Sequence, residues 1–170
     1  MGWGDIDDAQ STQAIHAAVD LGGRLFDSAQ AYGAGHSETL LGHALKNRPD
    51  VALITKFGWA IDTRAKTLGE MITDPATIRT SLDASRKRFQ RDHIDLVLMH
   101  PNDMDIALAA PNFDALDKMQ AEGAIGGYGW STDFPDRLNA FADRTAFTAT
   151  EHAMNVFFRA EHMVSAIQAA

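Results

Sequence analysis

Short apolar runs alternate with amphipathic stretches along this chain. The apolar runs begin near residues 24, 51, 95, 125 and 146 and have the sequences "RLFD", "VALITK", "IDLVLMH", "AIGGYGWS" and "AFTATEH". Between them, apolar residues recur every three or four positions, as they do on one face of a helix. Alternation of this kind predicts parallel strands that are connected by helices packed against the sheet.

Capping signals indicate where the predicted helices begin. Ser11, Ser37 and Asp74 each precede a helical pattern and are expected to cap it, with Pro75 at the first helical position after Asp74. The predicted helices span residues 11–23, 37–47, 75–90, 112–123, 134–143 and 160–170. Residues 57–74 and 102–112 are expected to be loops, where specificity is often determined.

The spacing of the predicted strands limits which folds the chain can adopt. Strand starts recur about every 30 residues, the length of a strand, a crossover helix and the return, and no linker divides residues 1–170, which we expect to form a single domain. A closed (β/α)8 TIM barrel has eight strands and about 250 residues. About five β/α units therefore favour an incomplete barrel that lacks the first strand and the C-terminal part. An open α/β sheet is the alternative.

Composition excludes several classes of function. The net charge of −8 gives no attraction to nucleic acid or to an anionic membrane surface, and the basic run at 85–91 is interpreted as a solvated helix face. The chain has no cysteine, which excludes disulfides and thiolate nucleophiles. No apolar run is long enough to span a bilayer and the first residues do not form a signal peptide, so we expect a cytoplasmic protein. The seven histidines form no helical i, i+4 pair, and no metal site is predicted.

Three predicted strands end in residues that can take part in proton transfer. Asp27 ends "RLFD", Lys56 ends "VALITK" and His100 ends "IDLVLMH". Carboxyl ends of parallel strands open onto one face, which holds the active site in such folds. Tyr32 follows the first of these strands and can fold over the same face. The four side chains are therefore expected to converge.

Together, these four residues could catalyse a proton transfer that none of them would be expected to catalyse alone. Alone, the aspartate would more often cap a helix, the lysine would be solvated and the histidine would belong to a turn. Together, a lysine makes a nearby phenol more acidic, a carboxylate holds the lysine, and a histidine orients a carbonyl oxygen. Such a site would protonate a carbonyl oxygen while a nicotinamide cofactor delivers hydride to carbon, because no side chain supplies hydride.

The motifs around these residues resemble those of the aldo-keto reductase family, in order and along nearly the whole chain. "FDSAQAYGAGHSETLLGHAL" is similar to the aspartate–tyrosine signature, "LITKFG" to the strand that bears the lysine, and "IDLVLMHPND" to the strand that bears the histidine. The resemblance implies a (β/α)8 barrel and reduction of an aldehyde or ketone to an alcohol, with NADPH as the cofactor and NADH as the alternative. Tyr32 would be the proton donor, Lys56 would favour its ionisation, Asp27 would hold the lysine and His100 would orient the carbonyl.

The resemblance also implies cofactor contacts from Asp27 and from the ends of two later strands. The family binds the nicotinamide carboxamide with a Ser-Asn pair and a glutamine, and the corresponding residues here are Ser131, Thr132 and Glu151. Thr132 and Glu151 depart from the family pattern. A carboxylate accepts hydrogen bonds but cannot donate them, whereas an amide does both.

The substrate is expected to be a small carbonyl compound held at the rim by Trp3, Trp59 and His100. Missing strands would leave unpaired sheet edges, so self-association is expected. Two alternatives stay open: a non-catalytic, cofactor-binding regulatory subunit, and a truncated barrel fragment that is inactive by itself. Strands seven and eight of the family carry an aromatic that stacks on the nicotinamide and a loop that binds phosphate, and residues 1–170 contain neither.

Overall fold

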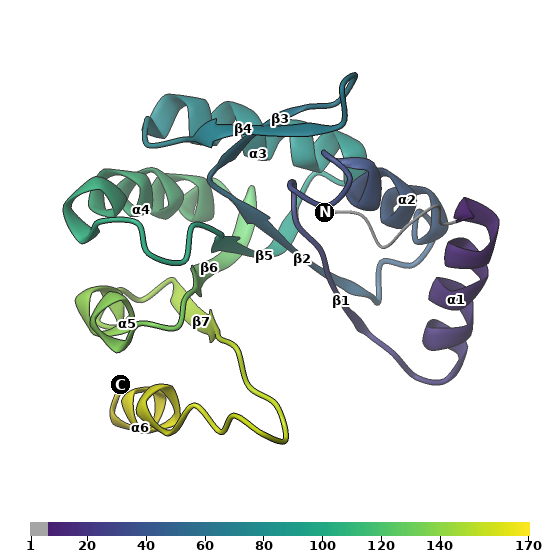
Figure 1. The fold of residues 1–170 in the computed structure, drawn as a ribbon. Helices are drawn as coiled ribbons and strands as arrows, with labels where there is room; N and C mark the ends of the chain where they lie inside the picture. Colours follow the sequence, from purple (N-terminus) through teal and green to yellow (C-terminus); the bar gives the residue numbers. More distant parts are fainter. Residues whose placement is uncertain (1–6) are drawn as a thin grey trace.

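A computed structural model describes residues 7–170 and contains a curved sheet of five parallel strands in the order β1-β2-β5-β6-β7. The five strands confirm the predicted α/β class and the alternating pattern, and Figure 1 shows them surrounded by an arc of helices. The strands of this sheet are β1 (Leu25–Asp27), β2 (Ala52–Phe57), β5 (Ile94–Met99), β6 (Ile125–Ser131) and β7 (Phe147–Glu151).

Helices follow the strands in the order that the sequence predicts, with some different starting points. They are α1 (Asp8–Asp20), α2 (His36–Ala44), α3 (Pro75–Phe89), α4 (Ile106–Ala121), α5 (Pro135–Phe141) and α6 (Glu161–Ala169). Asp74 caps α3 as predicted. Ser11 does not cap α1, because the carboxylate of Asp7 accepts from the Ala9 amide at 2.8 Å and starts the helix earlier. Ser37 is already inside α2, whose cap is Gly35.

The two segments predicted as loops contain regular structure. Residues 57–74 include a two-stranded antiparallel hairpin of β3 (Trp59–Asp62) and β4 (Thr67–Met71), both labelled in Figure 1. Most of the second segment belongs to α4, which begins after Asp105 and continues through Pro111. The side chain of Asp105 accepts from the Ala107 amide at 2.7 Å and caps the start of this helix.

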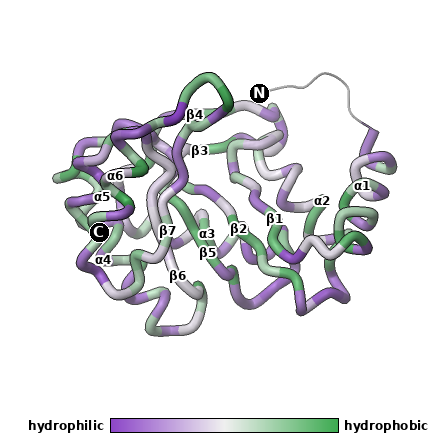
Figure 2. Tube along the Cα trace, turned by 90° about the horizontal axis from the view of Figure 1, so that it is seen from below, coloured by the Kyte–Doolittle hydropathy of each residue, from purple (hydrophilic) through white to green (hydrophobic). Residues whose placement is uncertain are grey.

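The core lies between the sheet and the helices. Figure 2 shows the hydrophobic character of β2 and β5 in the middle of the sheet. Phe113 of α4 is fully buried, and its ring centroid lies 4.4 to 5.7 Å from those of four other aromatic residues. These four come from β6, α5 and β7: Tyr128, Trp130, Phe141 and Phe147. Tyr128 is fully buried within this cluster.

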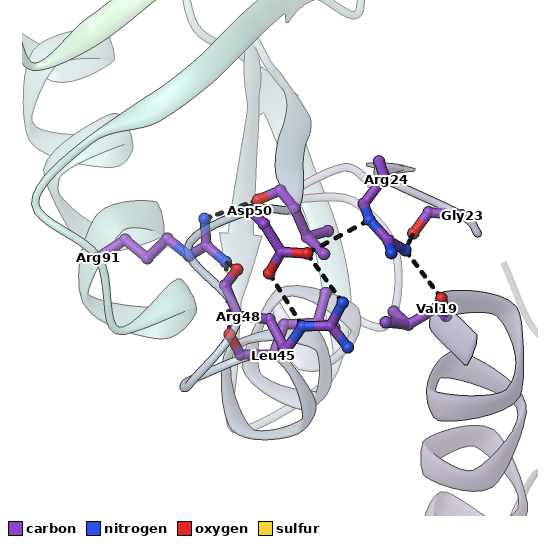
Figure 3. A network of polar contacts seen from close by, with 8 residues as sticks. Val19, Gly23, Arg24, Leu45, Arg48, Asp50 and Arg91 are labelled. Atoms are coloured by element: carbon purple, nitrogen blue, oxygen red, sulfur yellow. Dashed lines mark hydrogen bonds and ion pairs between the residues drawn. The ribbon is translucent and has the colours of Figure 1, made fainter. Parts of the chain in front are cut away.

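An arginine network joins the segments at the amino-terminal ends of β1 and β2 (Figure 3). Arg24 donates to the Val19 carbonyl at 2.8 Å and lies 3.3 Å from the Asp50 carboxylate, which also pairs with Arg48 at 2.8 Å. Arg91 donates to carbonyl oxygens of the segment after α2. These contacts fix where α1, α2 and α3 meet the sheet. Within residues 7–170, none of the helices has the length and apolar character needed to cross a bilayer.

Candidate active site

Strand register places four of the predicted site residues on one face of the sheet. Asp27 on β1 pairs with Ile54 on β2, and Lys56 lies on β2 two positions after Ile54. Ser131 pairs with Glu151 at the other end of the sheet. Because paired residues and residues two apart in a strand share a face, β1 and β2 direct Asp27 and Lys56 to a single side. Pairing through β5 and β6 extends this face to Ser131 and Glu151.

Lys56 is the buried centre of this face. Its side chain is 1% exposed, and the ammonium donates to the Asp27 carboxylate and, at 3.2 Å, to the Ser28 carbonyl oxygen. The Glu151 carboxylate lies 3.3 Å away. Burial disfavours the charged lysine, but the hydrogen bond and charge of Asp27, supported by Glu151, outweigh burial and raise the pKa of Lys56. The lysine is therefore a fixed positive charge.

Tyr32 lies beside this charge. The Lys56 ammonium is 5.4 Å from the centroid of the Tyr32 ring, and the imidazole of His100 meets that ring edge-on with centroids 5.9 Å apart. The turn that carries Tyr32 requires left-handed backbone at Gly33 and Gly35, with φ of 60° and 90°. Those glycines explain the "YGAG" of the sequence. Within residues 7–170 the Tyr32 hydroxyl makes no hydrogen bond to the protein.

His100 follows β5 and is held by its backbone, whose amide donates to the Phe57 carbonyl at 2.8 Å. Its Nδ1 is buried and has no hydrogen-bond partner within the described residues. Burial, and then the positive charge of Lys56, lower the pKa of His100 below its ordinary 6.5. The imidazole is therefore neutral at neutral pH. A neutral imidazole carries one N–H, which can be donated to a substrate carbonyl oxygen.

Ser131 and Thr132 differ in what their hydroxyl groups contact. The Thr132 hydroxyl donates to the Asn102 carbonyl at 2.7 Å and accepts from the Phe134 amide at 3.2 Å, and the residue is buried. It is thus already used to fix the turn after β6. Ser131 is half-buried, and its hydroxyl makes no hydrogen bond within residues 7–170. Of the two, Ser131 has the hydroxyl that is free to contact a ligand.

Glu151 ends β7 with a carboxylate that is 44% exposed. Burial and the neighbouring Asp27 carboxylate raise the pKa of Glu151, and Lys56 opposes the change. The two carboxylates thus contact the lysine from opposite edges of the sheet. Sequence reasoning assigned Glu151 to the cofactor alone and did not predict this ion pair.

Of the two tryptophans predicted to lie at the rim, Trp59 belongs to the part of the chain that the structure describes. Trp59 starts β3 three residues after Lys56 and is half-buried. The turn between them contains Gly58, which has a φ of 111° and packs where a Cβ would lie 2.5 Å from the Pro101 ring. The hairpin is therefore joined closely to the segment after His100. Trp3 lies outside the described residues.

Several residues that shape the site carried no signal of this role in the sequence. The fully buried Glu38 of the "SETLLG" segment pairs with Arg88 at 2.6 Å and accepts from Thr55 on β2 at 2.6 Å. Arg88 belongs to the basic run expected to be a solvated face, so that interpretation holds only in part. The Ser28 carbonyl that contacts Lys56 is a backbone group, which residue identity cannot reveal.

Comparison with known proteins points to one family. The model of the aldo/keto reductase family matches residues 1–169. The chain is 31% identical over 160 residues to Aldo-keto reductase YhdN of Bacillus subtilis, which covers 92% of this chain and 47% of that protein. It is 31% identical over 155 residues to D-threo-aldose 1-dehydrogenase of a Pseudomonas species, covering 78% of this chain and 47% of that protein.

Solved structures give the same result. The glycerol dehydrogenase of Gluconobacter oxydans superposes with a TM-score of 0.83 and 30% identity, over 98% of this chain and 52% of that chain. The holo form of an aldo-keto reductase from Bacillus halodurans gives a TM-score of 0.80 and 25% identity over 88% of this chain and 50% of that chain. The chain thus spans about half the length of these relatives. With the family model matching nearly every residue, this chain belongs to the aldo/keto reductase family.

Proposed function

We propose that this protein is an NAD(P)H-dependent oxidoreductase that reduces an aldehyde or ketone to an alcohol, with Tyr32 as the proton donor. The observation that carries the proposal is the convergence of four side chains from three separate strand ends. Asp27 contacts Lys56, the Lys56 ammonium lies 5.4 Å from the ring of Tyr32, and His100 packs against the same ring. A protein that only senses cofactor would not need this arrangement.

Each residue of the chain has a separate part in the proposed reaction. His100, neutral at neutral pH, donates its N–H to the substrate carbonyl oxygen and orients it toward Tyr32. Tyr32 gives its proton to that oxygen as the alcohol forms, and the positive charge of Lys56 stabilises the phenolate that remains. Asp27 keeps the ammonium in place. A nicotinamide cofactor, when bound, supplies the hydride.

The residues at the ends of β6 and β7 fit a carboxamide. Ser131 offers a hydroxyl that can donate to its oxygen, and Glu151 offers a carboxylate that can accept from its NH₂ group. The Oε2 atom of Glu151 is the one that lies near Lys56, which leaves Oε1 for this contact. Thr132 supports the turn rather than the ligand. NADPH is the proposed cofactor because the family uses it more often, and NADH is the alternative.

The proposed substrate is a small carbonyl compound that carries hydroxyl groups. Two of the relatives are named as an aldose dehydrogenase and a glycerol dehydrogenase, which supports this class. His100 would contact the carbonyl, and Trp59 at the start of the hairpin would form part of the rim. Steady-state assays with glyceraldehyde, simple sugars and unsubstituted aldehydes of equal length would test the preference.

Replacing Tyr32 with Phe tests the function directly. We expect kcat to fall by about 10²–10⁴-fold, the usual contribution of a general acid, while the Kd for NADPH measured by fluorescence titration stays the same. Tyr128→Phe is the matched control, because that phenol lies in the core and contacts Asp117 instead. Turnover that survives Tyr32→Phe would favour the regulatory alternative.

A further inference from the structure

The loop that carries Tyr32 is fixed to the sheet by its backbone only at its start. Residues 28–35 join β1 to α2, and we call them the Tyr32 loop. The amide of Gln30 donates to the Lys56 carbonyl oxygen on β2 at 3.0 Å, which extends the pairing of β1 with β2. After Gln30, the backbone hydrogen bonds of the loop run to its own residues and to the start of α2. Side-chain contacts are therefore needed to hold the rest of the loop in place.

Two residues of α3, Ser85 and Arg88, supply such contacts. The side-chain amide of Gln30 donates to the Ser85 hydroxyl oxygen at 2.9 Å, and the Arg88 guanidinium donates to the same oxygen at 3.0 Å. At the end of the loop, Gly35 packs so closely on Arg88 that a Cβ there would lie 2.9 Å from the arginine side chain. Ser85 and Arg88 thus contact the loop both before and after Tyr32.

Arg88 also joins the loop to the strand that carries Lys56. Its Nε donates to one carboxylate oxygen of Glu38 at 2.6 Å, and the Thr55 hydroxyl donates to the other at 2.6 Å. Glu38 lies in the first turn of α2 and is fully buried. Thr55 directly precedes Lys56 and points to the opposite face of β2. The arginine therefore connects the loop, the start of α2 and the helix-facing side of β2.

We propose that Arg88 is a positioning residue, which holds the Tyr32 loop so that the phenol ring stays beside Lys56 and His100. A buried ion pair adds little net stability compared with an apolar pair of the same volume, which favours a role of the Glu38–Arg88 pair in geometry. The effect of Arg88 on turnover rests on the proposed function, in which Tyr32 donates a proton. Its effect on the position of the loop does not.

The test compares two aromatic contacts of the same kind by NMR. Tyr32 and His100 form the site contact, with ring centroids 5.9 Å apart and planes at 84°. Tyr128 and Phe147 form a reference contact in the core, at 6.1 Å and 82°. Because the chain has only two tyrosines, nuclear Overhauser effects from labelled tyrosine rings report both contacts in one spectrum. The reference contact shows whether the fold is intact.

Two test variants disconnect the loop in different ways. Glu38→Gln combined with Arg88→Met removes the ion pair without leaving an uncompensated charge buried. Ser85→Ala keeps both charges and removes the hydroxyl to which Gln30 and Arg88 donate, so it decides the question if the double variant unfolds. We expect the Overhauser effect of the site contact to be lost in the double variant and weakened in Ser85→Ala, while that of the reference contact remains.

Arg144→Met is the matched control. Arg144 also joins separate segments, because it pairs with Asp114 and Asp117 of α4 at 2.6 and 2.7 Å. It precedes the amino-terminal end of β7, whereas Tyr32 follows the carboxyl end of a parallel strand. Urea denaturation should show a loss of stability in this variant, with the site contact unchanged. A site contact that persists in both test variants, or that is lost equally in Arg144→Met, would overturn the proposal.

Turnover provides a second readout. A misplacement of about 1 Å can reduce a rate about 10²-fold, so kcat per folded molecule should fall by about that factor in the double variant. KM should change little, because His100 still meets the substrate carbonyl. Arg88→Lys keeps a positive charge for Glu38 but lacks the planar fork that also reaches Ser85. Its kcat should therefore lie between those of the double variant and the unaltered protein.

The two readouts separate this proposal from the proposed function. If the unaltered protein shows no reductase activity but the site contact is lost in the test variants, the proposed function fails and the positioning role of Arg88 stands. If the protein is active and the site contact persists in both test variants, only the positioning role fails.

Discussion

Lys56 shows how single residues acquire their properties in this protein. A lysine ordinarily extends into water, and burial alone would lower its pKa. Here the carboxylate of Asp27 reverses that direction, and the ammonium stays charged while almost completely buried. Sequence alone predicts that lysine and aspartate meet at neighbouring strand ends. It does not predict that Ser28 and Glu151 complete the set.

His100 leads to a prediction about pH. Its folded pKa lies below 6.5, because burial and Lys56 both disfavour the imidazolium. Just below pH 6.5 the unfolded chain therefore binds more protons than the folded chain, so stability falls as the pH decreases there. The contribution is complete above pH 6.5 and is lost as the pH drops toward the folded pKa. Urea titrations at several pH values should show this dependence, and His100→Gln should weaken it.

NMR of the His100 ring gives a direct check of the same point. More than half of the imidazole should be neutral at pH 6.5, and Lys56→Met should move the pKa of His100 back toward the ordinary value, because one of the two causes that lower it is removed. A His100 ring that is protonated at neutral pH would contradict the assignment. It would also remove the neutral donor from the proposed mechanism.

At the scale of elements, local signals explain most boundaries and tertiary contacts explain the rest. Asp74 and Pro75 mark the start of α3 in the sequence and in the structure. The β3–β4 hairpin escaped prediction because all five residues of β4 are exposed, and an exposed strand shows no alternation of apolar and polar residues. The Asp62 carboxylate accepts from the amides of Arg64 and Ala65 and stabilises the turn between the strands.

The crossing of α2 and α3 leads to a prediction about stability. Gly42 lies in the middle of α2, where alanine would favour the helix by about 1 kcal/mol. However, a Cβ at this position would lie 2.2 Å from the Arg88 carbonyl oxygen on α3, and backbone cannot move aside easily. We expect Gly42→Ala to reduce the free energy of unfolding by about 1–3 kcal/mol.

His43→Ala is the matched control for this variant. His43 is exposed on the same helix, so alanine there should change the free energy of unfolding by less than about 0.5 kcal/mol. Chemical denaturation of both variants beside the unaltered protein measures the difference. Equal stability of Gly42→Ala and the unaltered protein would show that α2 and α3 can separate at little cost.

At the scale of the whole molecule, the sheet has two ends. β1 and β7 each pair with one neighbour only within the described residues, so each has one unpaired edge. The segment after β7 also carries exposed apolar side chains, with Val156 88% exposed and Phe157 97% exposed. Unpaired edges and exposed apolar side chains both promote association between copies of a chain.

We therefore expect the 170-residue chain to self-associate as its concentration rises. Analytical ultracentrifugation should show a mass that increases with concentration, and Val156→Ser combined with Phe157→Ser should reduce the effect because the exposed apolar area is smaller. Met104→Leu, a substitution at a buried position, serves as a control that leaves the surface unchanged. A chain that stays monomeric at every concentration would refute the expectation.

The sequence by itself determined the order of the helices and of the five strands of the parallel sheet, the face of that sheet on which the candidate site lies, and four of the residues that meet there. Each of these follows from periodicity and from the parallel direction of the strands, which are local properties repeated along the chain. Asp27, Lys56, Tyr32 and His100 all follow from that reasoning. Caps such as Asp74 were also visible because they act within one turn of the chain.

Only the tertiary structure decided which groups complete the site. The distance between Glu151 and Lys56 depends on how far the sheet curves from β2 to β7, a property of four adjacent strands together. The pairing of Glu38 with Arg88 likewise depends on how α2 crosses α3. Contacts between segments far apart in the chain depend on packing, and packing depends on every intervening element. The charge beside Tyr32 is therefore a property of the fold rather than of any one motif.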